Sequence, residues 1–170
     1  HVKAAGAPDG KTIAFATDRG ATTSFTTLAF SPLQLATIDV ASGRISVFSP
    51  FSHGKHINPQ FSPDGRALFF VSDQDGFADI YRLDLASAAV SRVTRLSTGV
   101  SGITSISPAL SVAPSTGRML FSVFEDQGYA VLGLDSSRTH GEAMLLGANV
   151  GNAGGVPPGD FVPGPRRGDS

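Results

Sequence analysis

Two histidines stand three positions apart, a spacing that can bind a metal ion. His53 and His56 lie in the stretch SHGKHINP, and on a helix this spacing brings two side chains together. The surrounding residues instead predict a turn that runs into a strand, where positions three apart point to opposite faces. No acidic residue stands near them in sequence to complete a zinc site. We therefore expect no metal here, and we keep His53, Lys55 and His56 as a candidate partner-binding loop.

The chain offers no nucleophile in a catalytic setting. A serine hydrolase needs Gly-x-Ser-x-Gly at a strand-to-helix turn. Ser101 has Gly99 and Gly102 around it, which is the wrong spacing, and we interpret this stretch as a flexible inserted loop. Cysteine is absent, which excludes thiolate nucleophiles and disulfides. The sequence thus predicts no catalytic residue and no cofactor.

Acidic residues in predicted turns raise the question of calcium. The stretch DQDG at 73–76 lacks the 12-residue loop of an EF-hand. Aspartate is common in turns because its side chain accepts hydrogen bonds from the backbone ahead of it, so we interpret these residues as turn caps. They are Asp9, Asp18, Asp64, Asp73 and Asp75. The stretch RRGDS at 166–170 contains Arg-Gly-Asp, to which we assign no function.

Composition narrows the class of protein. The 170 residues carry a net charge of −1, and the only basic pair is Arg166-Arg167, so no nucleic-acid footprint is present. No apolar run reaches the roughly 18 residues of a membrane span. The chain opens with His1 rather than Met, and we expect it to be a processed or excised piece of a longer precursor.

The elements that must position these residues are short strands joined by turns, and they repeat. In the stretch 58–85, Pro63-Asp64-Gly65 predicts a turn, an apolar strand follows it, and ADIYRLDL alternates with a period of two. APDGKTIAFATDRG at 7–20 is an upstream copy, and APSTGRMLFSVFEDQGYAVLGLD at 113–135 is a downstream copy. Phe15, Phe70 and Phe121 are equivalent. Such spacing is typical of repeat architectures.

The repeat predicts an all-β fold of β-propeller blades. We expect about three four-stranded antiparallel blades in a partial propeller over 1–148, with blades near 2–50, 56–98 and 105–148. The apolar strands after the turns should be covered on both faces by neighbouring blades. GEAMLLGA at 141–148 should be the last strand of the third unit. Residues 149–170 are rich in Gly and Pro and should form a disordered or extended tail.

The pattern resembles the WD-like Pro-Asp repeat of TolB-type β-propellers. The resemblance covers residues 2–148, and the third unit keeps only the skeleton, with Phe124 where Asp is expected. Three blades do not close a ring, since propellers have about four to eight. The missing blades must come from further sequence, a second polypeptide or a partner copy. In the second unit the pattern stands as Pro59, Phe61, Ser62–Arg66, Phe70, Ser72-Asp73, Gly76, Asp79–Tyr81 and Asp84.

The resemblance implies a non-catalytic scaffold that binds a protein or a peptide, as TolB docks a peptidoglycan-associated lipoprotein. It implies a larger exported bacterial protein or assembly, periplasmic, outer-membrane-associated or extracellular. One alternative is the propeller domain of a peptidase, prolyl-oligopeptidase-like, tricorn-like or metallopeptidase-associated, that gates or presents peptides. Another is a structural subunit of a larger complex. Fold-level likeness does not choose among these functions.

Overall fold

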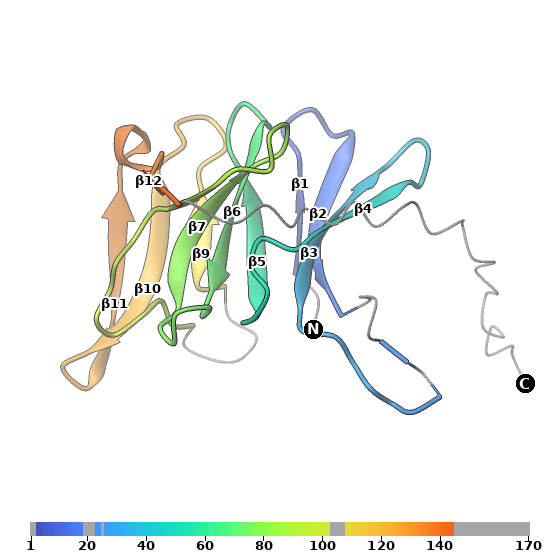
Figure 1. The fold of residues 1–170 in the computed structure, drawn as a ribbon. Helices are drawn as coiled ribbons and strands as arrows, with labels where there is room; N and C mark the ends of the chain where they lie inside the picture. Colours follow the sequence, from blue (N-terminus) through green and yellow to red (C-terminus); the bar gives the residue numbers. More distant parts are fainter. Residues whose placement is uncertain (1–2, 19–22, 25, 103–107, 145–170) are drawn as a thin grey trace, which may run out of the picture.

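The computed structural model describes residues 3–18, 23–24, 26–102 and 108–144. These residues form twelve strands and one short 3₁₀ helix. The strands make three antiparallel sheets that stand side by side (Figure 1). The expected all-β class with a propeller-like arrangement of sheets is confirmed.

Each sheet is built mainly from strands that follow one another in sequence. The first sheet has the order β1 (Ala4–Gly6), β2 (Thr12–Thr17), β3 (Gln34–Asp39) and β4 (Ile45–Phe48). The second sheet contains β5 (His56–Phe61), β6 (Ala67–Ser72), β7 (Asp79–Asp84), β8 (Val90–Arg92) and, beyond β8, β12 (Glu142–Ala143). The third sheet contains β9 (Leu110–Val112), β10 (Met119–Glu125) and β11 (Gly128–Leu134), and the 3₁₀ helix η1 (Ser136–Arg138) follows it.

The Pro-Asp-Gly turns reverse the chain between the first two strands of each of the first two sheets. Asp64 Oδ1 accepts hydrogen bonds from the Arg66 amide at 3.1 Å and from Ser62 Oγ at 2.6 Å. Gly65 has φ = +69°, a conformation that other residues adopt at a cost. Asp9 accepts in the same way from the Lys11 amide at 3.0 Å. Aspartate therefore acts as a turn cap at both copies.

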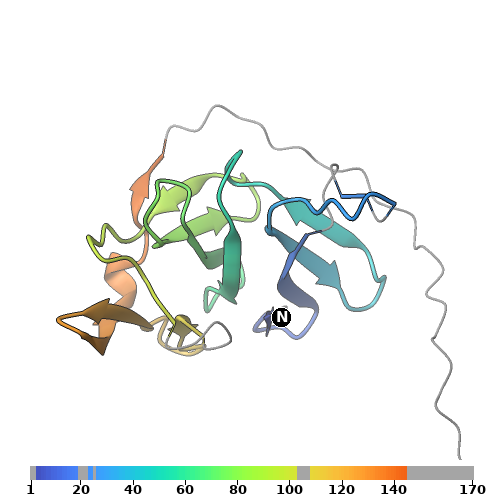
Figure 2. The same ribbon diagram turned by 90° about the horizontal axis from the view of Figure 1, so that it is seen from below.

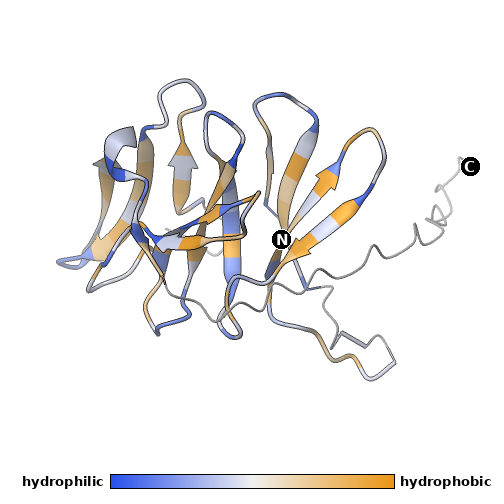
Figure 3. Ribbon diagram, turned by 45° about the horizontal axis from the view of Figure 1, so that its top comes forward, coloured by the Kyte–Doolittle hydropathy of each residue, from blue (hydrophilic) through white to orange (hydrophobic). Residues whose placement is uncertain are grey.

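The sheets fan out from a common side (Figure 2), and their first strands β1, β5 and β9 contact one another in turn. The second sheet lies in the middle, and all six residues of β6 are buried. Hydrophobic residues lie along the strands and hydrophilic residues at the turns (Figure 3). One core cluster fills the junction of the second and third sheets, and two smaller clusters fill the junction of the first and second.

An irregularity in β5 links the second sheet to the third. The register of β5 against β6 shifts between Ile57 and Gln60. Asn58 lies in this shift with φ = +57°, a conformation that asparagine tolerates better than most residues. Its side-chain amide donates to the Leu110 carbonyl of β9 at 2.9 Å. The bulge thus directs the buried side-chain amide of Asn58 toward β9, across the junction of the second and third sheets.

The last strand is placed differently from expectation. Of the stretch 141–148, Glu142–Ala143 forms β12, which pairs with β8 of the second sheet and not with the third sheet. The physical reason is the short β8, whose outer edge is free to accept it. Ser91 Oγ donates to the His140 carbonyl at 2.7 Å, and the Met144 amide donates to the Val90 carbonyl at 3.1 Å. The described part of the third sheet therefore has three strands and the second sheet has five.

In the described residues, the apolar strands of the two outer sheets are only partly covered on their outer faces, which corrects a second expectation. Ile13 of β2 and Leu120 and Phe124 of β10 are exposed. The reason is that β6 has a neighbouring sheet on each side, whereas β2 and β10 each have one. The predicted tail at 149–170 lies outside the described residues.

Candidate functional site

The structure separates the three predicted loop residues. His53 and Lys55 are exposed, whereas His56 begins β5 and is 2% exposed. The His56 ring packs edge-on against Phe51 and Phe70, with ring centres 5.6 and 5.8 Å apart. Burial lowers the pKa of His56 below its ordinary value of 6.5, so the ring is uncharged near neutral pH. His53 and Lys55 are therefore the members that solvent can reach.

A polar partner satisfies the buried imidazole. His56 Nδ1 lies 3.0 Å from Ser72 Oγ, which is itself fully buried on β6. A buried polar ring without such a partner would destabilise the fold by roughly 1–3 kcal/mol. The pair resembles the first two members of a hydrolytic triad only in residue type. Its hydroxyl is closed off from solvent, so we assign it a packing role.

The exposed loop is held rigidly against the turn between β6 and β7. Asp73 Oδ1 accepts a hydrogen bond from the Lys55 amide at 2.9 Å, and the Lys55 ammonium lies 3.5 Å from Asp73 Oδ2. Gly54 has φ = +81°, and a Cβ at this position would lie 2.9 Å from Gln74 Cα. Only glycine fits this close approach of two backbones. His53 and Lys55 are thus presented from a fixed platform.

A cleft of about 280 Å³ opens beside this platform, and we call it the loop-end cleft. The amide of His56 donates to the Leu33 carbonyl at 2.9 Å, which fixes the segment before β3 against the platform. Gln34 Nε2 donates to Ser49 Oγ at 2.8 Å on the same side. The lining therefore combines small polar groups with one aromatic wall. It consists of Ser31, Pro32, Gln34, Phe51, Ser52, Gly54 and His56.

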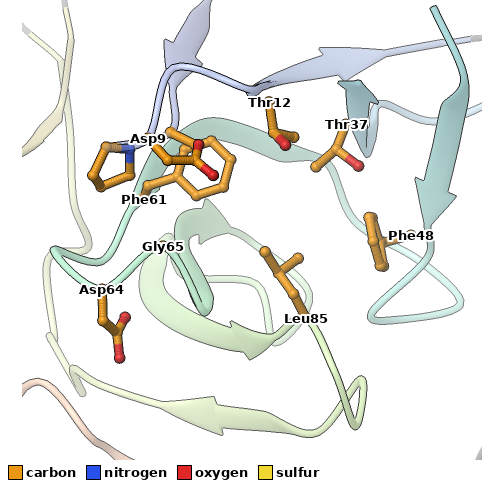
Figure 4. Close-up of a pocket in the computed structure, with 10 residues that line it drawn as sticks. Asp9, Thr12, Thr37, Phe48, Phe61, Asp64, Gly65 and Leu85 are labelled. Carbon is orange, nitrogen blue, oxygen red and sulfur yellow. The ribbon is translucent and has the colours of Figure 1, made fainter. Parts of the chain in front are cut away.

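A second cleft, of about 360 Å³, lies at the opposite end of the same two sheets, and we call it the turn-end cleft (Figure 4). Thr12, Thr37 and Phe48 of the first sheet surround the same opening as Phe61 and Leu85 of the second (Figure 4). The two Pro-Asp-Gly turns complete its rim through Asp9 and Asp64, together with Ala7, Pro8 and Gly65. The Ser62 hydroxyl, which donates to the carboxylate, is the main cause that lowers the pKa of Asp64 below its ordinary value.

Sequence reasoning identified the turns of this second cleft but not its strand residues. Thr37 and Phe48 occupy ordinary strand positions and Leu85 directly follows β7, and only the packing of one sheet on the next brings the three together. The signal that was available is the repeat itself. Because equivalent turns fall at the same end of neighbouring blades, the copies at Asp9 and Asp64 had to approach each other.

A buried ion pair stabilises the outer part of the second sheet. Asp79 is fully buried and accepts hydrogen bonds from Arg92 Nη2 at 2.5 Å, Thr94 Oγ1 at 2.7 Å and the Leu96 amide at 3.1 Å. Arg92 also bonds Asp75 at 2.7 Å, and its guanidinium lies 5.9 Å from the centre of the Tyr81 ring. Burial raises the pKa of the Tyr81 phenol. These groups satisfy one another, so the arrangement is architectural.

The stretch around Ser101 is more ordered at its start than the sequence indicated. Val100 is buried and bridges to Val123 of β10, and the Ser101 amide donates to the Ser122 carbonyl at 2.9 Å. Gly99 has φ = +75° and packs against the backbone of Ala78. Residues 103–107 lie outside the described part. Ser101 therefore directly follows a β-bridge to β10, and no base lies beside its hydroxyl among the contacts described.

The described residues contain neither a metal-binding cluster nor a membrane-spanning helix. No group of three or more His, Cys, Asp or Glu side chains there is arranged to hold a metal ion. Within the same residues, no helix is long and apolar enough to cross a membrane.

Comparison with known proteins identifies the fold. No protein-family model and no curated protein sequence matches the chain. A structure of putative TolB from Agrobacterium tumefaciens is 20% identical in sequence, with a TM-score of 0.62. The match covers 85% of this chain and 48% of that TolB chain. TolB from Acinetobacter baumannii is 15% identical in sequence, with a TM-score of 0.50. The match covers 84% of this chain and 42% of that TolB chain.

A puromycin hydrolase complexed with PGG is 16% identical in sequence, and the match covers 94% of this chain and 30% of the hydrolase chain. Its TM-score of 0.47 is too low to support an argument. The chain spans less than half the length of either TolB structure. At these identities the likeness establishes the fold alone. Together with the three antiparallel sheets, it shows that this chain has the fold of part of a TolB-like β-propeller.

Proposed function

We propose that this chain is part of an exported bacterial propeller that binds a protein or peptide partner and catalyses no reaction itself. The proposed compartment is the periplasm or the outer surface of the cell envelope. The TolB-like repeat and the TolB-like fold support this proposal, and both are properties of a scaffold rather than of a reaction centre.

The observation that carries the proposal is the platform beside the loop-end cleft. His53 and Lys55 are exposed there on a backbone that Asp73 and Gly54 hold in place. Groups that are fixed before binding lose little conformational entropy when a partner arrives. The cleft of about 280 Å³ is at the lower limit of small-molecule sites, which span roughly 300–1,000 Å³. It suits one or two side chains of a peptide better than a bound cofactor.

A peptide-display experiment tests this proposal. A phage-displayed library of random short peptides is selected on the immobilised chain, and the dissociation constant of the strongest binder is measured by calorimetry. The double variant His53→Ala/Lys55→Ala is expected to weaken binding about tenfold or more. The matched control is His140→Ala/Lys11→Ala, which removes the same side-chain types from exposed positions outside the platform.

Equal binding by the two double variants, or no enriched peptide at all, contradicts the proposal. The same selected peptides are incubated with the chain and followed by mass spectrometry. Cleavage of a selected peptide by the purified chain would replace the scaffold proposal with the peptidase alternative. Binding without cleavage supports the scaffold.

A further inference from the structure

We propose that two copies of this chain close a ring of six sheets, with the first sheet of each copy packed on the third sheet of the other. The proposal concerns assembly, and it does not depend on whether the loop-end cleft binds a peptide. It starts from the two sheet junctions that already exist within one chain.

The two internal junctions are of the same type. At the first, Phe70 of β6 packs against Leu35 of the preceding sheet. At the second, Phe121 of β10 packs against Phe69 and Val71 of the preceding sheet. Phe70 and Phe121 are equivalent in the repeat. Each sheet therefore has a front face, which bears this phenylalanine, and a back face, which bears the residue before it and receives the next sheet.

Within the described residues, one front face and one back face have no neighbouring sheet, and we call these the free faces. The free front face belongs to the first sheet, where Phe15 is the equivalent phenylalanine and Ile13, Ile38 and Ile45 stand in cross-strand register. Ile13 is 37% exposed and Ile45 is 43% exposed. A row of apolar side chains across three strands is not typical of a face in contact with solvent. In a half-exposed antiparallel sheet the positions that point outward are polar.

The free back face belongs to the third sheet. Leu120 and Phe124 of β10 lie on it with Tyr129 and Val131 of β11, and Val131 is 67% exposed. The rings of Phe124 and Tyr129 already pack edge-on, with centres 5.0 Å apart. Large exposed apolar patches on a folded protein mark interaction surfaces.

A second copy carries the missing half of both junctions. Its front face fits the back face of the first copy, and its back face fits the front face of the first copy. The two free faces lie on the two outer sheets of the fan (Figure 2), so one twofold axis forms both contacts at once. Such an arrangement closes and does not extend into a fibre. Six sheets fall within the range of about four to eight found in propellers.

The junction between copies repeats an interface that the chain builds twice internally. No new packing chemistry is therefore needed.

Oligomeric state is the first test. The chain of residues 1–170 is expected to sediment as a dimer in analytical ultracentrifugation. Val131→Lys and Ile45→Lys each place a charge in the proposed contact and are expected to raise the dimer dissociation constant on the order of a hundredfold. Phe77→Lys is the control, because Phe77 is 55% exposed in the turn between β6 and β7 and lies on neither face. Circular dichroism confirms that each variant is folded.

Engineered cysteines test which faces meet, since the chain has no cysteine of its own. Val131 is the repeat equivalent of Leu35, which clusters with Phe70, so in the ring Val131 contacts Phe15 of the other copy. A Phe15→Cys chain mixed with a Val131→Cys chain is expected to cross-link with a short bismaleimide. Neither chain should cross-link alone, and a Phe77→Cys chain should not cross-link with Val131→Cys.

Two results overturn the proposal. A chain that remains monomeric up to about 0.1 mM has no dimer of useful affinity, and the free faces then belong to blades from elsewhere. Self-cross-linking of the Val131→Cys chain indicates back-to-back stacking of two third sheets, which does not close a ring.

Discussion

Asp79 and His56 are buried titratable residues that anchor the second sheet, and neither has a surface role. Asp79 holds the guanidinium of Arg92 with two further donors. His56 is satisfied by Ser72 within a ring of aromatic neighbours. A buried charge is stable only while it is paired, and a buried neutral imidazole only while it stays neutral. Each residue therefore makes a measurable prediction about stability.

Asp79→Asn is expected to lower the free energy of unfolding by about 3 kcal/mol, because it removes the buried carboxylate and leaves Arg92 only its partly exposed partner Asp75. Urea denaturation followed by circular dichroism measures the change. Asp84→Asn is the control: its carboxylate caps an exposed turn through the Ser87 amide, and its loss should cost about 1 kcal/mol. Equal losses for the two variants would contradict the assignment of Asp79 as a buried ion-pair partner.

We expect the folded chain to lose stability as pH falls below about 6.5, because His56 then becomes protonated in the unfolded chain. Burial lowers the pKa of His56 in the folded chain, although Asp73 opposes this shift. The unfolded chain therefore binds a proton at higher pH than the folded chain, so protonation favours unfolding below the unfolded pKa. The stability is fully present above that pH and declines as pH falls toward the folded pKa.

The measurement is urea denaturation at about pH 7.5 and about pH 5.5. His56→Gln should show a smaller decrease between the two conditions than the unmodified chain, whatever its stability at neutral pH. His53→Gln, at an exposed position, should keep the full decrease. A decrease unaffected by His56→Gln would show that the imidazole is not the group responsible.

At the scale of the elements, β12 shows how a strand can join a sheet other than the one it follows in sequence. The chain leaves β11, passes through η1 and reaches the edge of β8 at Gly141. Gly141 has φ = +70°, and a Cβ there would lie 2.5 Å from the Arg92 carbonyl oxygen. This contact is backbone against backbone and cannot be relieved by a side-chain movement. The glycine permits the crossing from the third sheet to the second.

Gly141→Ala is expected to detach β12 from β8. Gly10→Ala is the matched control, since Gly10 has the same φ of +70° but no atom within 4 Å of its hypothetical Cβ. The control measures the conformational cost alone, about 1–2 kcal/mol. Hydrogen exchange at the Met144 amide, which bonds the Val90 carbonyl, should accelerate in Gly141→Ala and remain slow in Gly10→Ala. Equal protection in both variants would contradict the role of this close approach.

At the scale of the whole molecule, the second sheet carries the contacts of both others. The cluster between the second and third sheets contains Met119, Phe121 and Val123, and the clusters between the first and second contain Ala14, Leu35 and Phe70. In such an array each unit is stabilised mainly by its nearest neighbours. Stability is then expected to differ between the sheets.

Val123→Ala should destabilise the third sheet locally. Removal of two buried methyl groups costs on the order of 1–3 kcal/mol. Amide exchange should accelerate in β10 and β11 and change little in β2 and β3, because the second sheet lies between them. Uniform acceleration across all three sheets would indicate a single cooperative unit instead.

The repeat allowed much of the fold to be predicted and little of the site. Three copies of one turn-and-strand pattern were sufficient for the all-β class, because each copy carries its own turn residues and strand alternation. The position of β12 was predicted wrongly, since pairing at a sheet edge depends on which edge is free and not on sequence order. His56 was grouped with His53 because residue type alone does not reveal that one of the two side chains is buried and the other exposed.

The sequence by itself determined the local events: where the chain reverses at Asp9 and Asp64, which segments extend, and which residues alternate between faces. These follow from backbone preferences and side-chain polarity within a few residues. Only the tertiary structure decided which faces are buried, where the two clefts open and which apolar faces stay free. Those outcomes depend on how one sheet packs on the next, and packing is a property of surfaces assembled from residues far apart in the chain.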